Sequence, residues 1–176
     1  MRAIQMLAMV GLIAGHAAPV AAQSAADYRE MQAMKLEWER QTVLAMVDSM
    51  PEHLLRDRVT EEQRDFAQQV HHAVSAVGFF SQRFMTDAEV PAADTSVVLN
   101  SRAALSEYVN AVYDFALAAL RTQPEADRGA MADLFGQEVP KWAIWDEIHQ
   151  HSTWTLGQIV ANFRKHGMAP PAFSFF

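Results

Sequence analysis

The 176-residue chain contains no cysteine, which excludes disulfide bonds and thiolate chemistry supplied by the protein itself. Any metal ligand or nucleophile must therefore be a His, Asp, Glu, Ser, Thr or Tyr side chain. Basic residues are also scarce, because 14 Lys and Arg stand against 21 Asp and Glu. An acidic chain lacks the basic surface that nucleic-acid binding requires, so we expect no nucleic-acid partner.

Long hydrophobic runs are missing from the chain except at its start. Arg2 is followed by an apolar run over residues 3–15, and the small residues Val20, Ala21 and Ala22 then form a signal-peptidase site. The run is shorter than the roughly 20 residues that a membrane span needs. We therefore predict a cleaved signal peptide over residues 1–22, a periplasmic or secreted location and no stable membrane span in the mature chain. An uncleaved anchor is the alternative.

Cleavage would also make the net charge of the chain more negative. It removes one of the 14 basic residues, Arg2, and none of the 21 acidic residues, so the mature chain would carry 13 against 21, a formal charge of −8.

The apolar and polar alternation that is typical of β-strands is absent, as are internal repeats and low-complexity tracts. Apolar residues instead recur at helical spacing over residues 25–50, 64–85, 102–122 and 140–166. This pattern predicts an all-α fold, a four-helix bundle, in one domain over residues 23–176. The connection over residues 86–100 is long enough for a crossover. Residues 125–139 are predicted to hold one or two helical turns, around residues 131–135.

Capping and stop signals mark the expected ends of these helices. We predict N-terminal caps at Ser24 and Ser101, and a capping box formed by Thr60 and Gln63. Pro140 suits the first position of the last helix, and Gly167 suits a left-handed cap at its end.

The apolar stripe of each helix is expected to face inward. The predicted inward residues are Met31, Met34, Trp38, Ala45 and Val47 in the first helix; Phe66, Val70, Ala73, Val77 and Phe80 in the second; Leu105, Val109, Val112, Phe115 and Ala119 in the third; and Trp145, Ile148, Leu156, Ile159 and Phe163 in the last. The charged residues of the first helix, Glu39 among them, are predicted to face outward. His71, His149 and His166 are predicted to lie at the surface.

The segment over residues 146–171, which contains most of the last helix, carries the side chains best suited to bind a metal ion. Glu147 and His151 are four residues apart and share a helix face, the spacing at which two side chains hold one metal ion. His149 is two residues from His151 and therefore points about 200° away. Local spacing thus gives a Glu147 and His151 pair and no three-histidine site.

Two segments, RDFAQQVHHAV at residues 64–74 and HSTWTLGQIVANFRKHGMAPP at residues 151–171, resemble the DinB-like superfamily. The most specific pieces are Gly157-Gln158 and the exit from Gly167 to Pro171, and the resemblance covers essentially the whole mature chain. This family comprises small four-helix bundles and takes in transferases and isomerases that use mycothiol or bacillithiol. The resemblance implies a divalent metal, nickel or zinc, held by one His of the second helix and two of the last.

Carried over residue by residue, these ligand positions are His72, His151 and Thr155, where Thr155 replaces the third His of the family. A hydroxyl is a weak ligand beside imidazole, so the resemblance implies a degenerate site, which Glu147, another acid or water would complete. One interpretation is a metal centre that activates water or a thiol for reaction with a small-molecule substrate. The alternative is a non-catalytic bundle, small-molecule-binding or structural, that has lost metal binding. The sequence leaves enzymatic activity open.

A third interpretation is an interaction module that assembles through a helix face. The last helix carries Trp142, Trp145 and Trp154, which pack in the core or at the rim of a pocket in the simplest reading. They would also suit the interface of a homodimer.

Overall fold

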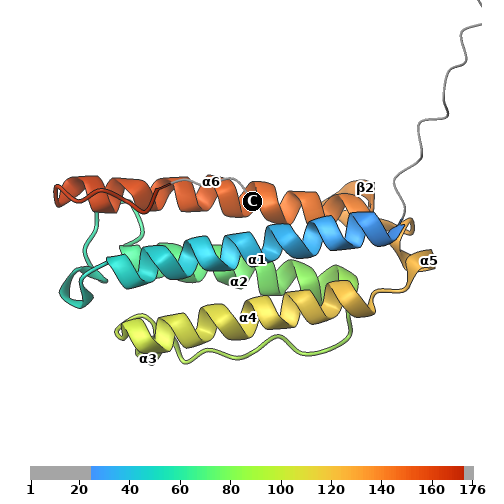
Figure 1. Ribbon diagram of the computed structural model, residues 1–176, viewed down its shortest axis with the longest axis horizontal. Coiled ribbons are helices and arrows are strands. Elements are labelled where there is room, and N and C mark those ends of the chain that lie inside the picture. Colours follow the sequence, from blue (N-terminus) through green and yellow to red (C-terminus); the bar gives the residue numbers. More distant parts are fainter. Residues whose placement is uncertain (1–24, 173–176) are drawn as a thin grey trace, which may run out of the picture.

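Four long helices packed side by side make up most of the protein (Figure 1). The computed structural model describes residues 25–172, so the predicted signal peptide lies outside the described residues. The long helices are α1 (Ala25–Ser49), α2 (Phe66–Met85), α4 (Arg102–Thr122) and α6 (Lys141–Lys165). The predicted four-helix bundle is confirmed, with a small two-stranded sheet in addition. Within the described range, no helix combines the length and the apolar character that crossing a membrane requires.

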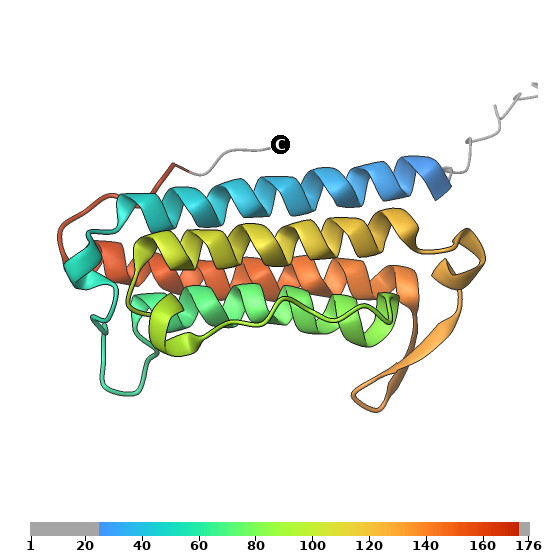
Figure 2. The same cartoon turned by 90° about the horizontal axis from the view of Figure 1, so that it is seen from below.

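The connection between α2 and α4 is a crossover, which we define as residues 86–101. It returns along the bundle, so that α2 and α4 run in the same direction (Figure 2). It includes one short helix, α3 (Thr95–Val98). At Gly78 the crossover touches α2 so closely that a Cβ would lie 2.5 Å from Cγ2 of Val90. A glycine is therefore required where the crossover passes α2.

The order of packing around the bundle decides which helices can share a site. Helix α2 packs against α4 and α6, and α1 packs against the same two helices. Helices α1 and α2, which are neighbours in sequence, therefore lie on opposite corners. Residues of α2 and α6 face each other along one seam, and residues of α1 and α6 face each other along another.

The capping box of α2 lies five residues later than predicted. Oδ1 of Asp65 accepts a hydrogen bond from the backbone N–H of Gln68 at 2.8 Å, and Oε1 of Gln68 accepts one from the N–H of Asp65 at 3.2 Å. Asp65 is buried and is also paired with Arg56 Nε at 2.8 Å, which fixes the start of α2 at Phe66. The Thr60 and Gln63 prediction is therefore wrong. The predicted caps at Ser101 and Gly167 are confirmed, with φ of 66° at Gly167.

The segment before α6 is a β-hairpin, and the predicted helical turns around residues 131–135 are wrong. The hairpin consists of strands β1 (Met131–Leu134) and β2 (Gln137–Pro140), which pair antiparallel. The other small elements are a 3-10 turn, η1 (Glu52–Leu54), and a short helix, α5 (Glu125–Arg128). Phe135 and Gly136 join the two strands with φ of 53° and 90°. Two positive φ values in succession close a tight hairpin and are incompatible with a right-handed helix. Pro140 is consequently the residue before α6, which begins at Lys141.

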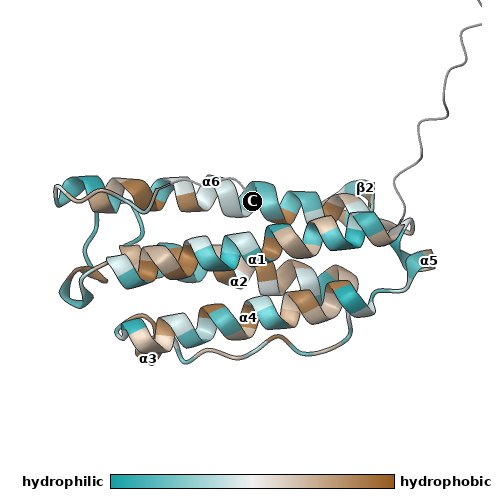
Figure 3. Cartoon of the chain, viewed as in Figure 1, coloured by the Kyte–Doolittle hydropathy of each residue, from teal (hydrophilic) through white to brown (hydrophobic). Residues whose placement is uncertain are grey.

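The core lies between the long helices, each of which carries apolar and polar stretches in alternation (Figure 3). Trp145, Tyr113, Phe66 and Phe163 are among its largest fully buried side chains. The predicted stripes of α2, α4 and α6 are buried apart from Phe80 and Phe115, which are partly exposed.

The predicted inward face of α1 is mostly wrong. Met31, Met34 and Ala45 are exposed, whereas the core residues of α1 are Leu36, Val43, Met46, Val47 and Met50. The buried face of α1 also holds the polar residues Gln32 and Glu39, so the spacing of apolar residues alone does not identify this face.

Candidate functional site

The structure brings together two of the predicted site residues, His72 of α2 and His151 of α6. The centroids of their rings lie 5.2 Å apart, with the ring planes at 70°. An imidazole nitrogen binds zinc at about 2.0–2.1 Å, so two imidazoles on one tetrahedral ion have ring centroids about 5 Å apart. The observed spacing fits a shared metal ion, and it also fits a simple edge-to-face contact between rings.

The surroundings of these two rings favour the neutral imidazole. Burial lowers the pKa of both His72 and His151, and the nearby Arg64 guanidinium lowers both further. Nδ1 of His151 is buried and finds no hydrogen-bond partner within residues 25–172. Metal binding needs a neutral imidazole with a free nitrogen, so both features suit a ligand histidine.

The other two predicted ligands are less suitable. Thr155 is buried one turn after His151, and its backbone carbonyl accepts a hydrogen bond from Gln69 Nε2 at 3.4 Å. Glu147 is exposed. In the described part of the chain, no three His, Cys, Asp or Glu side chains gather closely enough to hold a metal ion. The donor set therefore fits a metal through two imidazoles, and any further ligand would be the Thr155 hydroxyl, water or a bound molecule.

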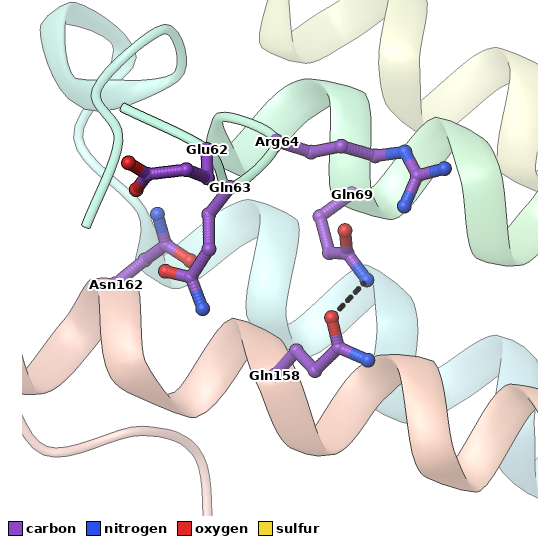
Figure 4. Close-up of a pocket in the computed structure, with 6 residues that line it drawn as sticks. All are labelled: Glu62, Gln63, Arg64, Gln69, Gln158 and Asn162. Carbon is purple, nitrogen blue, oxygen red and sulfur yellow. Dashed lines mark hydrogen bonds between the residues drawn. The ribbon is translucent and has the colours of Figure 1, made fainter. Parts of the chain in front are cut away.

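A polar cavity of about 390 Å³ opens along the same seam between α2 and α6 (Figure 4). Gln69 lies one turn before His72 on α2, and Gln158 lies two turns after His151 on α6. Gln69 Nε2 donates to Gln158 Oε1 at 3.2 Å and links the two helices. The cavity is lined by Glu62, Gln63, Arg64, Gln69, Gln158 and Asn162. Amide groups and one guanidinium can bind the oxygens of a small polar molecule.

Arg64 connects this cavity to the histidines. It also lines a second cavity of about 270 Å³, together with His71, His72 and Ser75. The sequence analysis did not identify Arg64, Gln69 or Asn162, because none of them stands at a metal-ligand spacing. Their role follows only from the packing of α6 and the loop before α2 around the same space.

Aromatic side chains flank the histidine pair. The ring centroid of Phe80 lies 6.4 Å from that of His151, and the ring of Phe135, at the hairpin turn, lies 6.1 Å from that of Phe80. Phe135 is 75% exposed and has a positive φ, a backbone conformation that is unfavourable for a bulky side chain. The hairpin thus places an exposed aromatic ring next to the wall of the site.

The predicted surface positions of Glu39 and His149 are wrong, because the two residues form a buried polar cluster between α1, α4 and α6. Nδ1 of His149 lies 2.5 Å from Oε1 of Glu39, and its Nε2 lies 2.7 Å from Oε1 of Gln32. Tyr113 donates a hydrogen bond to Glu39 at 3.4 Å. Burial raises the pKa of Glu39, and its hydrogen bond with His149 opposes that rise. The cluster joins α1 to α4 and α6 through these hydrogen bonds, so we assign it a structural role.

The remaining predicted surface histidines are partly buried. His71 stacks on Tyr108 with ring centroids 5.1 Å apart, and His166 Nε2 lies 2.8 Å from Oδ2 of Asp57. Neither belongs to the histidine pair, as predicted.

The three tryptophans of α6 differ in exposure. Trp145 is fully buried, whereas Trp142 is 44% exposed and Trp154 is 78% exposed. Only the last two can contribute to a surface contact.

Comparisons with known proteins agree with this architecture. The crystal structure of a DinB-like protein from Bacillus cereus ATCC 10987 matches with a TM-score of 0.69 and 15% sequence identity, covering 86% of this chain and 99% of that chain. At that identity the likeness shows a shared fold. No match was found among curated protein sequences. A family model described as the DinB family matches residues 28–176. Because that match spans most of the sequence, the chain belongs to the DinB family.

Proposed function

We propose that the protein binds a divalent metal ion, nickel or zinc, through His72 and His151, at a site open to a small-molecule substrate. The observation that carries the proposal is the 5.2 Å separation of the two rings, together with the buried, unpartnered Nδ1 of His151. The resemblance of residues 64–74 and 151–171 to the family's ligand positions supports it. The replacement of the third His by Thr155 makes the site degenerate.

Different residues of the site would bind the metal ion and the substrate. His72 and His151 hold the ion, which when bound supplies Lewis-acid activation of water or a thiol. Arg64 and the amides of Gln69 and Gln158 bind and orient the polar end of a substrate in the cavity between α2 and α6. Phe80 bounds the site on its apolar side.

Metal analysis of protein purified without chelator and then reloaded with nickel or zinc tests this proposal. We expect about one ion per chain in the unmodified protein and its loss in His72→Ala and His151→Ala. His53→Ala is the matched control, since His53 is exposed and belongs to η1. Absence of metal from the unmodified protein under metal-replete conditions would overturn the proposal.

Two further variants test the incomplete ligand set. Thr155→His should raise metal affinity, because an imidazole would replace a weak hydroxyl ligand. Unchanged affinity would mean that this position does not face the pair. Glu147→Gln should leave affinity unchanged, since Glu147 is exposed. A loss of affinity would instead identify Glu147 as the completing ligand.

The second candidate function is metal-independent binding of a small polar molecule by a non-catalytic bundle. It is favoured by the cavity that Arg64, Gln69, Gln158 and Asn162 line without help from the histidines. Thermal shifts of chelator-treated protein with small carboxylates and phosphates distinguish the two. Stabilisation that survives chelation and His151→Ala but disappears in Arg64→Met supports this candidate. Stabilisation only in the presence of metal supports the first.

A further inference from the structure

An apolar groove of about 420 Å³ lies on the side of α6 that faces α1, away from the proposed metal site. Helix α1 contributes Trp38, Thr42 and Met46 to its walls, and α6 contributes Leu156, Gly157 and Val160. Thr153 and Arg164 line its two ends along α6.

Gly157 leaves the groove open at its middle. A glycine inside a helix is unfavourable relative to alanine, so its presence calls for a reason. An ideal Cβ on Gly157 would meet no described heavy atom within 4 Å, and thus no described neighbour requires a glycine. A group placed in the groove would make close contact with the bare backbone at this position.

The chain after α6 is directed back into this groove. Gly167, with φ of 66°, reverses the chain, and the N–H of Met168 donates to the carbonyl of Phe163 at 3.0 Å. Figure 2 shows this segment turning back from the end of α6 toward α1. Pro170, Pro171 and Ala172 then line the groove themselves. The last described residue, Ala172, therefore lies at the wall of the groove.

We propose that the segment Phe173-Ser174-Phe175-Phe176, the C-terminal segment, binds in this groove and seals α1 against α6. Four extended residues reach about 13 Å. The groove runs along α6 from Arg164 to Thr153, a helical distance of about 16 Å. Three of the four side chains are phenyl rings, which match the apolar walls, and burying them removes apolar surface from water. One ring would lie over Gly157.

The absence of cysteine makes this proposal testable by disulfide trapping. Ser174→Cys is combined with Thr42→Cys or with Thr153→Cys, which lie on the two walls of the groove. The matched control combines Ser174→Cys with Ala118→Cys, an exposed position on α4. Under mild oxidation we expect an intrachain disulfide in at least one groove pair, formed at least tenfold faster than in the control. Rates equal to the control in both groove pairs would overturn the proposal.

A groove-filling variant guards against a chance crosslink. The helical circular dichroism spectrum checks that Gly157→Leu keeps its fold. A Cβ at position 157 would meet no described heavy atom within 4 Å, so the leucine enters the groove without a clash at its first atom. We expect it to slow trapping at least fivefold by displacing the C-terminal segment. Unchanged trapping would contradict the proposed path across Gly157.

Other occupants give distinct results, each of which would overturn the proposal. A second copy of the chain would give intermolecular disulfides and a dimer mass by light scattering. A captured apolar small molecule would appear as added mass in native mass spectrometry, without intrachain trapping.

A chain ending at Ala172 should bind more of the dye 1-anilinonaphthalene-8-sulfonate than the full chain, because the groove is then uncovered. Equal dye binding would also count against the C-terminal segment.

Discussion

Glu39 and His149 lie inside the bundle although both are residue types that are usually found at the surface. Glu39 is 2% exposed, and its side chain makes contacts from α1 to both α4 and α6. A buried carboxylate is tolerated only when hydrogen-bond partners replace water, and here His149 and Tyr113 are those partners. The specific pairing of these residues therefore determines which face of α1 turns inward.

Truncation of His149 should destabilise the protein strongly. In His149→Ala the carboxylate of Glu39 stays buried without its main partner, so we expect a loss of about 3–5 kcal/mol in the free energy of unfolding. Urea denaturation measures this loss. Adding Glu39→Gln to His149→Ala should recover part of it, because the unpaired charge is removed. If the double variant is no more stable than His149→Ala, the loss comes from packing and not from the charge.

Stability should depend on pH through the histidine pair. The pKa values of His72 and His151 are lowered in the folded protein from the ordinary value of 6.5, chiefly by burial. The unfolded chain therefore binds more protons as the pH falls through 6.5. The contribution of the pair to stability is fully present above 6.5 and is lost as the pH falls toward the lowered values.

Urea denaturation between about pH 7.5 and pH 5 tests this dependence. His72→Gln and His151→Gln should each lose less stability over that interval than the unmodified protein. Glu39 has a raised pKa and acts in the opposite sense, since its contribution is lost as the pH rises above its ordinary value of 4.5. Equal slopes in the histidine variants and the unmodified protein would mean that the pair does not titrate differently on folding.

The elements differ in how well the sequence predicts them. The apolar stripes of α2, α4 and α6 mark their buried faces, although α6 also buries Ser152, Thr155 and Asn162. Helix α1 could be located but not oriented, since Gln32 and Glu39 are buried by partners far away in sequence. The hairpin has strands of four residues, too short to show a period, and its Phe-Gly turn lacks the Asn-Gly or Asp-Gly signal of such turns.

The candidate site was predictable only where a motif marks it. His72 and His151 follow from the resemblance to a known family, and their proximity depends on the packing of α2 against α6. Arg64 lies in a loop and Phe135 lies in a hairpin turn, and neither segment has a periodic sequence pattern. The positions of these two residues near the site could therefore not be predicted from the sequence.

The hairpin turn should be stabilised by relieving the strain at Phe135. Phe135→Asn places at φ of 53° a residue that tolerates this conformation, and we expect slower amide hydrogen exchange across β1 and β2. Gly136→Ala should have the opposite effect, because φ of 90° disfavours any side chain. The helices should exchange as before in both variants. Faster exchange in Phe135→Asn would show that the contact with Phe80 outweighs the strain.

At the scale of the whole molecule, residues 1–22 have the charged start, the apolar run and the small residues of a signal peptide. We propose that residues 1–22 direct export and are removed. Expression with the native N-terminus should yield a periplasmic protein whose mass lacks those residues, and Ala22→Arg should block the removal by changing the residue before the cut. A full-length mass in the membrane fraction would favour the uncleaved anchor.

The homodimer predicted from the last helix stays a proposal, with its contacts now restricted. Trp145 is excluded from a dimer surface because it is fully buried, whereas Trp154 is 78% exposed. Light scattering on the unmodified protein and on Trp154→Ser is the appropriate measurement.

The crossover over residues 86–101 also decides which parts of α2 are covered. Val90 of the crossover lies against Gly78 of α2, and the same glycine is close to Val112 of α4. The crossover thus lies against α2 at Gly78. Nearer the start of α2, Leu99 of the same crossover lines the cavity that also contains Arg64 and His72. The crossover therefore covers α2 closely at one point and leaves a polar opening beside His72 at another.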